Sequence, residues 1–191
     1  AFNSLIMDPD LITSVPNDIY VFNAIDAYFH SMESLAGNYR NPFADGLSSW
    51  SLSLVSEVLK SDDIKSEENR HKLMLASFLA GTAIGNSFVG LVHPFSAGLS
   101  MVLSIPHTLA NCIAMNAMEE FYPSQFVEFE YFLKKNNISL PKQVCRNLDD
   151  QEFKDLFEAT IVHEKPLSNA LGSGFKEILQ ESKVRDLFSR M

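Results

Sequence analysis

Apolar residues recur every three or four positions along most of the chain, the spacing typical of amphipathic helices. Pro, Gly and polar clusters separate these stretches, as at residues 38–46 and 163–174. We predict helices over residues 16–37, 47–61, 73–88, 108–123, 125–138, 149–162 and 174–191, with residues 61–72 leading into the third. A further apolar stretch, 90–107, is interrupted by Pro94 and Pro106. The predicted fold class is all-α, a bundle of seven or eight helices around one core.

The opening segment differs from the rest. Residues 1–15 begin without Met and run as an extended apolar stretch into the turn residues Asp8, Pro9 and Asp10. No alternating strand pattern follows residue 15. We therefore expect residues 1–15 to be the end of a preceding domain, and residues 16–191 to be a separate helical domain.

Charge and composition exclude several classes of protein. The 191 residues carry 15 Lys and Arg against 24 Asp and Glu, a net charge of −9, and no basic run indicates nucleic-acid binding. The apolar stretch 73–92 approaches membrane length, but its polar residues and the following His93–Pro94 favour a buried helix over a membrane span. Cys112 and Cys145 are far apart, and we expect reduced thiols in a cytoplasmic protein without a signal peptide.

The candidate chemistry lies in the histidines. Asp26 and His30 are four residues apart on one predicted helix, which places their Cβ atoms roughly 5–6 Å apart. His93 and His107 also lie among apolar and small residues, whereas His71 is flanked by charges. These residues are either hydrogen-bonded core side chains or ligands of one metal ion. One carboxylate and three imidazoles suit Fe²⁺ or Zn²⁺, and the chain has no nucleophile motif, phosphate-binding loop or Cys-x-x-Cys pair.

Several motifs together resemble the C-terminal domain of the iron-containing (group III) alcohol dehydrogenases. They are "DAYFH", "NPFADGL" and "GLVHPFSAGLSMVLSIPH", in which a Pro-His follows the first histidine by fourteen residues. The resemblance covers the chain up to about Tyr122. It implies the helical metal-binding half of a two-domain enzyme of the dehydroquinate synthase-like fold, with Asp26, His30, His93 and His107 as ligands of the metal.

The resemblance also implies an activity and its requirements. We expect an alcohol to be oxidised by hydride transfer to NAD(P), with a small-molecule alcohol or sugar acid as substrate and a homo-oligomer as the assembly. Most cofactor contacts belong to an absent N-terminal domain, so residues 1–191 alone are expected to be inactive. The alternatives are a dehydroquinate synthase-like or glycerol-1-phosphate dehydrogenase-like enzyme, and a non-catalytic helical metal-binding domain.

A narrower resemblance concerns the substrate. "GLVHPFSAGLS", "NCIAMNAMEEFYP" and "HEKPLSNALG" resemble the 3-deoxy-manno-octulosonate 8-oxidases of lipopolysaccharide sugar biosynthesis. Ala97 stands where many family members have a second histidine beside the nicotinamide. It implies a roomier polar pocket, lined by residues drawn from Ser96, Ala97, Ser100, His163 and Lys165. In the alternative, Ala97 only packs and residues 163–169 form a surface turn.

Overall fold

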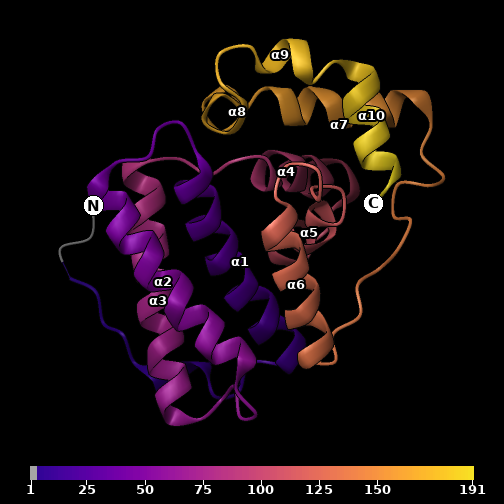
Figure 1. Ribbon diagram of the computed structural model, residues 1–191. Coiled ribbons are helices and arrows are strands. Elements are labelled where there is room, and N and C mark those ends of the chain that lie inside the picture. The colour runs from indigo at the N-terminus through magenta and orange to yellow at the C-terminus, as the bar shows by residue number, and fades with distance from the viewer. Residues whose placement is uncertain (1–3) are drawn as a thin grey trace.

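The apolar stripes of the sequence become helices in the computed structural model, which describes residues 4–191 (Figure 1). The prediction of an all-α fold is confirmed, since no strand occurs among these residues. The elements are η1 (Pro9–Ile12), α1 (Asn17–Ala36), α2 (Pro42–Lys60), α3 (Glu67–Asn86), α4 (Val92–Leu103), α5 (His107–Met115), α6 (Pro123–Lys135), α7 (Asp150–Ile161), α8 (Glu164–Leu171), α9 (Phe175–Ile178) and α10 (Glu181–Ser189).

Two segments predicted as loops are helical, and each has a proline in the first turn of its helix. Residues 42–46 belong to α2: the Asn41 side chain accepts a hydrogen bond from the Ala44 amide, and Pro42 takes the first helical position. Helix α8 occupies most of the predicted linker 163–174, with Pro166 in its first turn. Pro94 likewise lies in the first turn of α4 and does not interrupt it. A proline in the first turn removes only an amide that has no partner within the helix.

The helices form a bundle with a layer across one end. Helices α1, α2 and α3 pack together, α5 and α6 lie on the other side of α1, and α7–α10 cross the end of the molecule over α4 (Figure 1). Helices α4 and α7 approach closely at Gly98, where a Cβ atom would lie 2.9 Å from Thr160 Oγ1. The core is centred on α1, in which Val21, Ala24, Ile25 and Phe29 are completely buried.

Within the opening segment, residues 4–15 contact α3 and form no strand. Residues 9–12 form the 3-10 helix η1, where the sequence predicted a turn, and residues 1–3 lie outside the described part of the chain. The Arg70 guanidinium donates to the Pro9 carbonyl oxygen (3.1 Å) and pairs with Asp10 (3.0 Å). That residues 1–15 are the end of a preceding domain stays a prediction.

The long apolar stretch 73–92 is divided between helices. Most of it lies in α3, and its last residue begins α4 after a break at residues 87–91. Within residues 4–191, no helix is both long enough and apolar enough to span a membrane. Cys112 and Cys145 are buried free thiols.

Candidate metal centre

Three helices contribute the four residues that the sequence singled out. Asp26 and His30 lie one turn apart in the middle of α1, His93 is the second residue of α4, and His107 is the first residue of α5. Helix α4 ends at Leu103, and the φ of 55° at the following Ser104 lies in the left-handed region. This residue and Pro106 turn the chain so that α5 starts beside α4, and the rings of His93 and His107 lie 5.8 Å apart.

One oxygen of Asp26 is the geometric centre of the cluster. Its Oδ1 lies 3.4 Å from His93 Nε2, 3.7 Å from His107 Nε2 and 3.8 Å from His30 Nε2. Ligand atoms of Asp26, His93 and His107 all lie within 4.8 Å of one another, and the ring of His30 stacks on that of His93 with centroids 4.6 Å apart. The structure therefore brings the four residues together: Asp26, His93 and His107 form one group, and His30 packs on the His93 ring beside Asp26.

The geometry and the donor atoms fit a divalent metal ion. Two ligands bound to zinc at roughly 2.0–2.2 Å in a tetrahedral arrangement lie about 3.3–3.6 Å apart, close to the separations around Asp26. His93 Nε2 is buried and has no hydrogen-bond partner of good geometry among the described residues. An imidazole nitrogen that is buried without such a partner is costly unless it binds a cation. One oxygen and three nitrogen donors are a set that Fe²⁺ and Zn²⁺ accept.

The cluster also perturbs the protonation of its members. Burial by itself would raise the pKa of Asp26, but the adjacent imidazoles, His93 foremost, hold that pKa below its usual value. Burial and the neighbouring His93 lower the pKa of His30 to about 4, so this imidazole is neutral near pH 7. Burial opposes the charged form of His93, but the carboxylates of Glu33 and Asp26 raise its pKa to about 9. The carboxylates of Glu33 and Asp26 thus favour a positive charge at His93.

Two residues that sequence reasoning missed contact the cluster. The Glu33 carboxylate, completely buried, lies 2.5 Å from His93 Nδ1. Asn111 Nδ2 donates to Asp26 Oδ1 (2.6 Å) and lies 3.2 Å from His107 Nε2. Both were detectable by helical spacing, because Glu33 follows Asp26 by two turns and Asn111 follows His107 by one.

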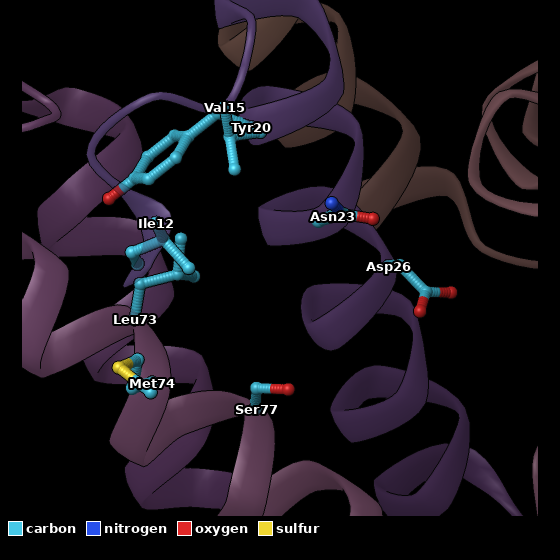
Figure 2. Close-up of a pocket in the computed structure, with 8 residues that line it drawn as sticks. All are labelled: Ile12, Val15, Tyr20, Asn23, Asp26, Leu73, Met74 and Ser77. Carbon is cyan, nitrogen blue, oxygen red and sulfur yellow. The ribbon is translucent and has the colours of Figure 1, made fainter. Parts of the chain in front are cut away.

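The cluster opens to solvent on one side. The side chain of His107 is 55% exposed, against 17% for Asp26 and 10% for His93. Asp26 also stands at the edge of a cavity of about 330 Å³ between α1 and α3, shown in Figure 2. The cavity is lined by Ile12, Val15, Tyr20, Asn23, Asp26, Leu73, Met74 and Ser77.

The predicted pocket residues lie in α4 and around the start of α8. Ser96 is buried and donates its hydroxyl hydrogen to the His93 carbonyl oxygen (2.9 Å), and Ala97 is partly exposed. His163 precedes α8, and its buried Nε2 has no hydrogen-bond partner in residues 4–191. The exposed Lys165 places its ammonium group 5.5 Å from the centre of the Phe88 ring. The substrate pocket stays a prediction, since the cavity that reaches Asp26 is lined by other residues.

The fold and the cluster together define a class of protein, a helical domain in which a carboxylate and several imidazoles form one candidate metal site. Residues 20–171 match the C-terminal part of the Fe-containing alcohol dehydrogenase family. The match spans most of the chain, and the protein belongs to this family. This family match agrees with the resemblance of the metal-site motifs to the iron-containing alcohol dehydrogenases.

Two curated proteins are similar in sequence to part of this chain. The chain is 31% identical over 111 residues to the bifunctional aldehyde-alcohol dehydrogenase AdhE of Escherichia coli (strain K12), covering 56% of this chain and 12% of that protein. It is 29% identical over 116 residues to alcohol dehydrogenase 4 of Schizosaccharomyces pombe, covering 60% of this chain and 28% of the relative. The chain thus spans less than a third of the length of these curated relatives.

A solved structure shares the fold. The crystal structure of sulfoacetaldehyde reductase from Bifidobacterium kashiwanohense in complex with NAD⁺ superposes with a TM-score of 0.76. The alignment covers 95% of this chain and 52% of that one at 18% identity. At this identity the likeness concerns the fold, and about half of the other chain has no counterpart here.

Proposed function

We propose that this chain is the metal-binding half of an alcohol oxidoreductase that transfers a hydride from an alcohol carbon to NAD(P)⁺. The observation that carries the proposal is the convergence of Asp26, His30, His93 and His107 around one point in a chain of this family. A nicotinamide-binding domain ahead of residue 16 and a cytoplasmic, homo-oligomeric setting belong to the same proposal.

The residues of this chain explain what such a site does. When bound, Fe²⁺ or Zn²⁺ supplies Lewis-acid charge that favours loss of the alcohol proton. Asp26 and the imidazoles of His30, His93 and His107 hold that ion. With neutral imidazoles, the carboxylates of Asp26 and the adjacent Glu33 balance a divalent charge. The exposed His107 marks the side from which the alcohol arrives. The overall reaction converts the alcohol and NAD(P)⁺ into a carbonyl compound, NAD(P)H and a proton.

The substrate that we propose is a polyhydroxylated sugar acid of the 3-deoxy-manno-octulosonate type, oxidised at a primary hydroxyl group. Ala97 supports it, because alanine leaves volume where a histidine would stand. The exposed ammonium group of Lys165 is a candidate partner for the substrate carboxylate. Rates of the full-length enzyme on this sugar acid, glycerol and simple primary alcohols test the proposal, and a preference for ethanol would contradict it.

The metal assignment is tested by replacing His107 with Ala in the full-length protein. We expect the wild type to carry about one iron or zinc ion per chain by elemental analysis. His107→Ala should lose this ion and the nicotinamide-dependent oxidation, with helix content unchanged because His107 is half exposed at the start of α5. The control is His71→Ala, an exposed histidine on α3, which should keep both. Stoichiometric metal in the His107 variant would refute the ligand set.

A further inference from the structure

Glu33 is a completely buried carboxylate that the chemistry so far does not explain. It lies on α1, two turns after Asp26 and about one turn after His30, so all three share a helix face. A buried carboxylate is costly unless hydrogen bonds satisfy it. Its partners therefore show why the fold retains it.

The two oxygens of Glu33 have different partners. Oε1 accepts a hydrogen bond from the Val92 amide (2.6 Å), which satisfies a free amide at the start of α4. Oε2 lies 2.5 Å from His93 Nδ1. The Tyr122 hydroxyl lies beside the same carboxylate and accepts from the Leu91 amide (3.1 Å).

The bond to His93 determines which ring nitrogen carries hydrogen. An ionised carboxylate only accepts, so Nδ1 must be the donor. When the imidazole is neutral, as it must be to bind a metal ion, Nε2 keeps its lone pair and faces Asp26 Oδ1 at 3.4 Å. This is the form of histidine that binds a metal through Nε2.

We propose that Glu33 is a positioning residue, whose carboxylate holds the His93 ring with hydrogen on Nδ1 and presents Nε2 to the metal ion. The inference rests on the proposed function, since it assigns a role toward the same ion. The contact to Val92 makes a purely structural role the alternative, in which Glu33 only completes the start of α4. The two roles predict different effects on metal binding when an amide side chain replaces the carboxylate at position 33.

Glu33→Gln separates the roles because it keeps size and shape. The amide oxygen of the substituted side chain still accepts from Val92, so the start of α4 stays satisfied. The amide nitrogen then faces His93 Nδ1 as a donor and favours the tautomer with hydrogen on Nε2, which cannot bind metal. We expect this variant to bind Zn²⁺ and Co²⁺ about 10- to 100-fold more weakly than wild type, in line with other substitutions around metal-ligating histidines.

The matched control is Tyr122→Phe, which removes a hydroxyl beside the same carboxylate but leaves the bond between Glu33 and His93. It should lower the melting temperature of the metal-free protein yet change metal affinity less than about threefold. The measurements are competition with a chelator and the visible absorption of the Co²⁺-loaded full-length protein. Wild-type affinity and an unchanged Co²⁺ spectrum in Glu33→Gln would overturn the inference, as would equal weakening in both variants.

A second measurement needs no variant at position 33. In the Zn²⁺-loaded wild type, nitrogen-15 NMR should show a proton on His93 Nδ1 and none on Nε2, with the signal assigned by its loss in His93→Gln. A proton on Nε2 would overturn the inference even if Glu33→Gln did not fold. Failure of the proposed function is distinguishable, because the wild type would then bind no stoichiometric metal.

Discussion

At the scale of single residues, the space around Glu33 depends on a glycine. A Cβ atom at Gly90 would lie 2.3 Å from Tyr122 Oη and 3.0 Å from Glu33 Oε1. Atoms that are not bonded cannot approach to 2.3 Å, so any side chain at position 90 displaces the Tyr122 hydroxyl from the Leu91 amide. Gly90 therefore leaves room for the polar contacts behind His93.

Gly90→Ala is expected to lower the free energy of unfolding by about 1–3 kcal/mol, the usual range for overpacking. Combined with Tyr122→Phe, which removes the obstructing oxygen, it should cost less than the sum of the two single changes. The control is Gly81→Ala in α3, where no atom lies within 4 Å of the added Cβ. That change should raise stability by about 0.5–1 kcal/mol, because alanine favours helix interiors. Urea unfolding compares the four variants with the wild type, and equal effects of Gly90→Ala and Gly81→Ala would contradict this account.

At the scale of elements, one carboxylate on α6 connects three helices. Glu128 Oε2 accepts from Tyr28 Oη on α1 (2.9 Å), and its Oε1 accepts from Lys60 Nζ on α2 (2.8 Å). Partial burial opposes the charge, but the hydrogen bonds from Lys60 and Tyr28 outweigh it and lower the pKa of Glu128 below 4.5. The ionised carboxylate thus stabilises the packing of α6 on α1 and α2.

The pH dependence of this contribution follows from the direction of the shift. A folded-state pKa below the unfolded value means that the stabilisation is present above about pH 4.5 and is lost as pH falls through the lower, folded value. Because the Glu128 side chain is 34% exposed, solvent screening limits the effect. Glu128→Gln should cost about 0.5–1 kcal/mol at pH 7 and progressively less below pH 4.5.

Thermal unfolding from about pH 7 to about pH 3 measures this difference. Glu130→Gln, on the exposed face of the same helix, is the charge-matched control and should differ little from wild type at either pH. A Glu128 effect that stays constant over this whole range would contradict the electrostatic explanation.

At the scale of the whole molecule, Asn169 ties the C-terminal helical layer to the bundle. The side chain, buried on α8, donates to the Phe88 (2.9 Å) and Val89 (3.1 Å) carbonyl oxygens and accepts from the Tyr39 amide (2.8 Å). A Cβ atom at Gly37 would lie 2.4 Å from Asn169 Cγ, so glycine is needed there. One amide thus joins α8 to the loops before α2 and α4.

Asn169→Ala should lower the free energy of unfolding by about 2–3 kcal/mol, because it removes the partner of three partly buried hydrogen bonds, to the Tyr39 amide and to the Phe88 and Val89 carbonyl groups. Hydrogen exchange should accelerate at the Tyr39 amide and across α8. Gln151→Ala, an exposed polar residue of the same layer, should change neither stability nor exchange at Tyr39. Unaltered protection of the Tyr39 amide in Asn169→Ala would contradict this role.

The sequence by itself determined the helical class, because apolar stripes recurring every three or four residues predict helices. The four-residue spacing of Asp26 and His30 places those two on one helix face, whereas His93 and His107 were named as ligands through the resemblance of their motifs to a known family. Helix starts at prolines were predicted less well, because Pro42 and Pro166 either end or begin a helix depending on the residues around them.

The tertiary structure alone decided how the cluster is supported. Whether His93 and His107 meet Asp26 depends on the left-handed turn at Ser104 and on the packing of α4 and α5 beside α1, which no local pattern encodes. The same holds for Asn169, which lies in a segment predicted to line a pocket and instead bonds to backbone far away in the chain, at Phe88 and Tyr39. Long-range contacts of buried polar groups are selected by the packed core as a whole, because only there does an unpaired group become costly.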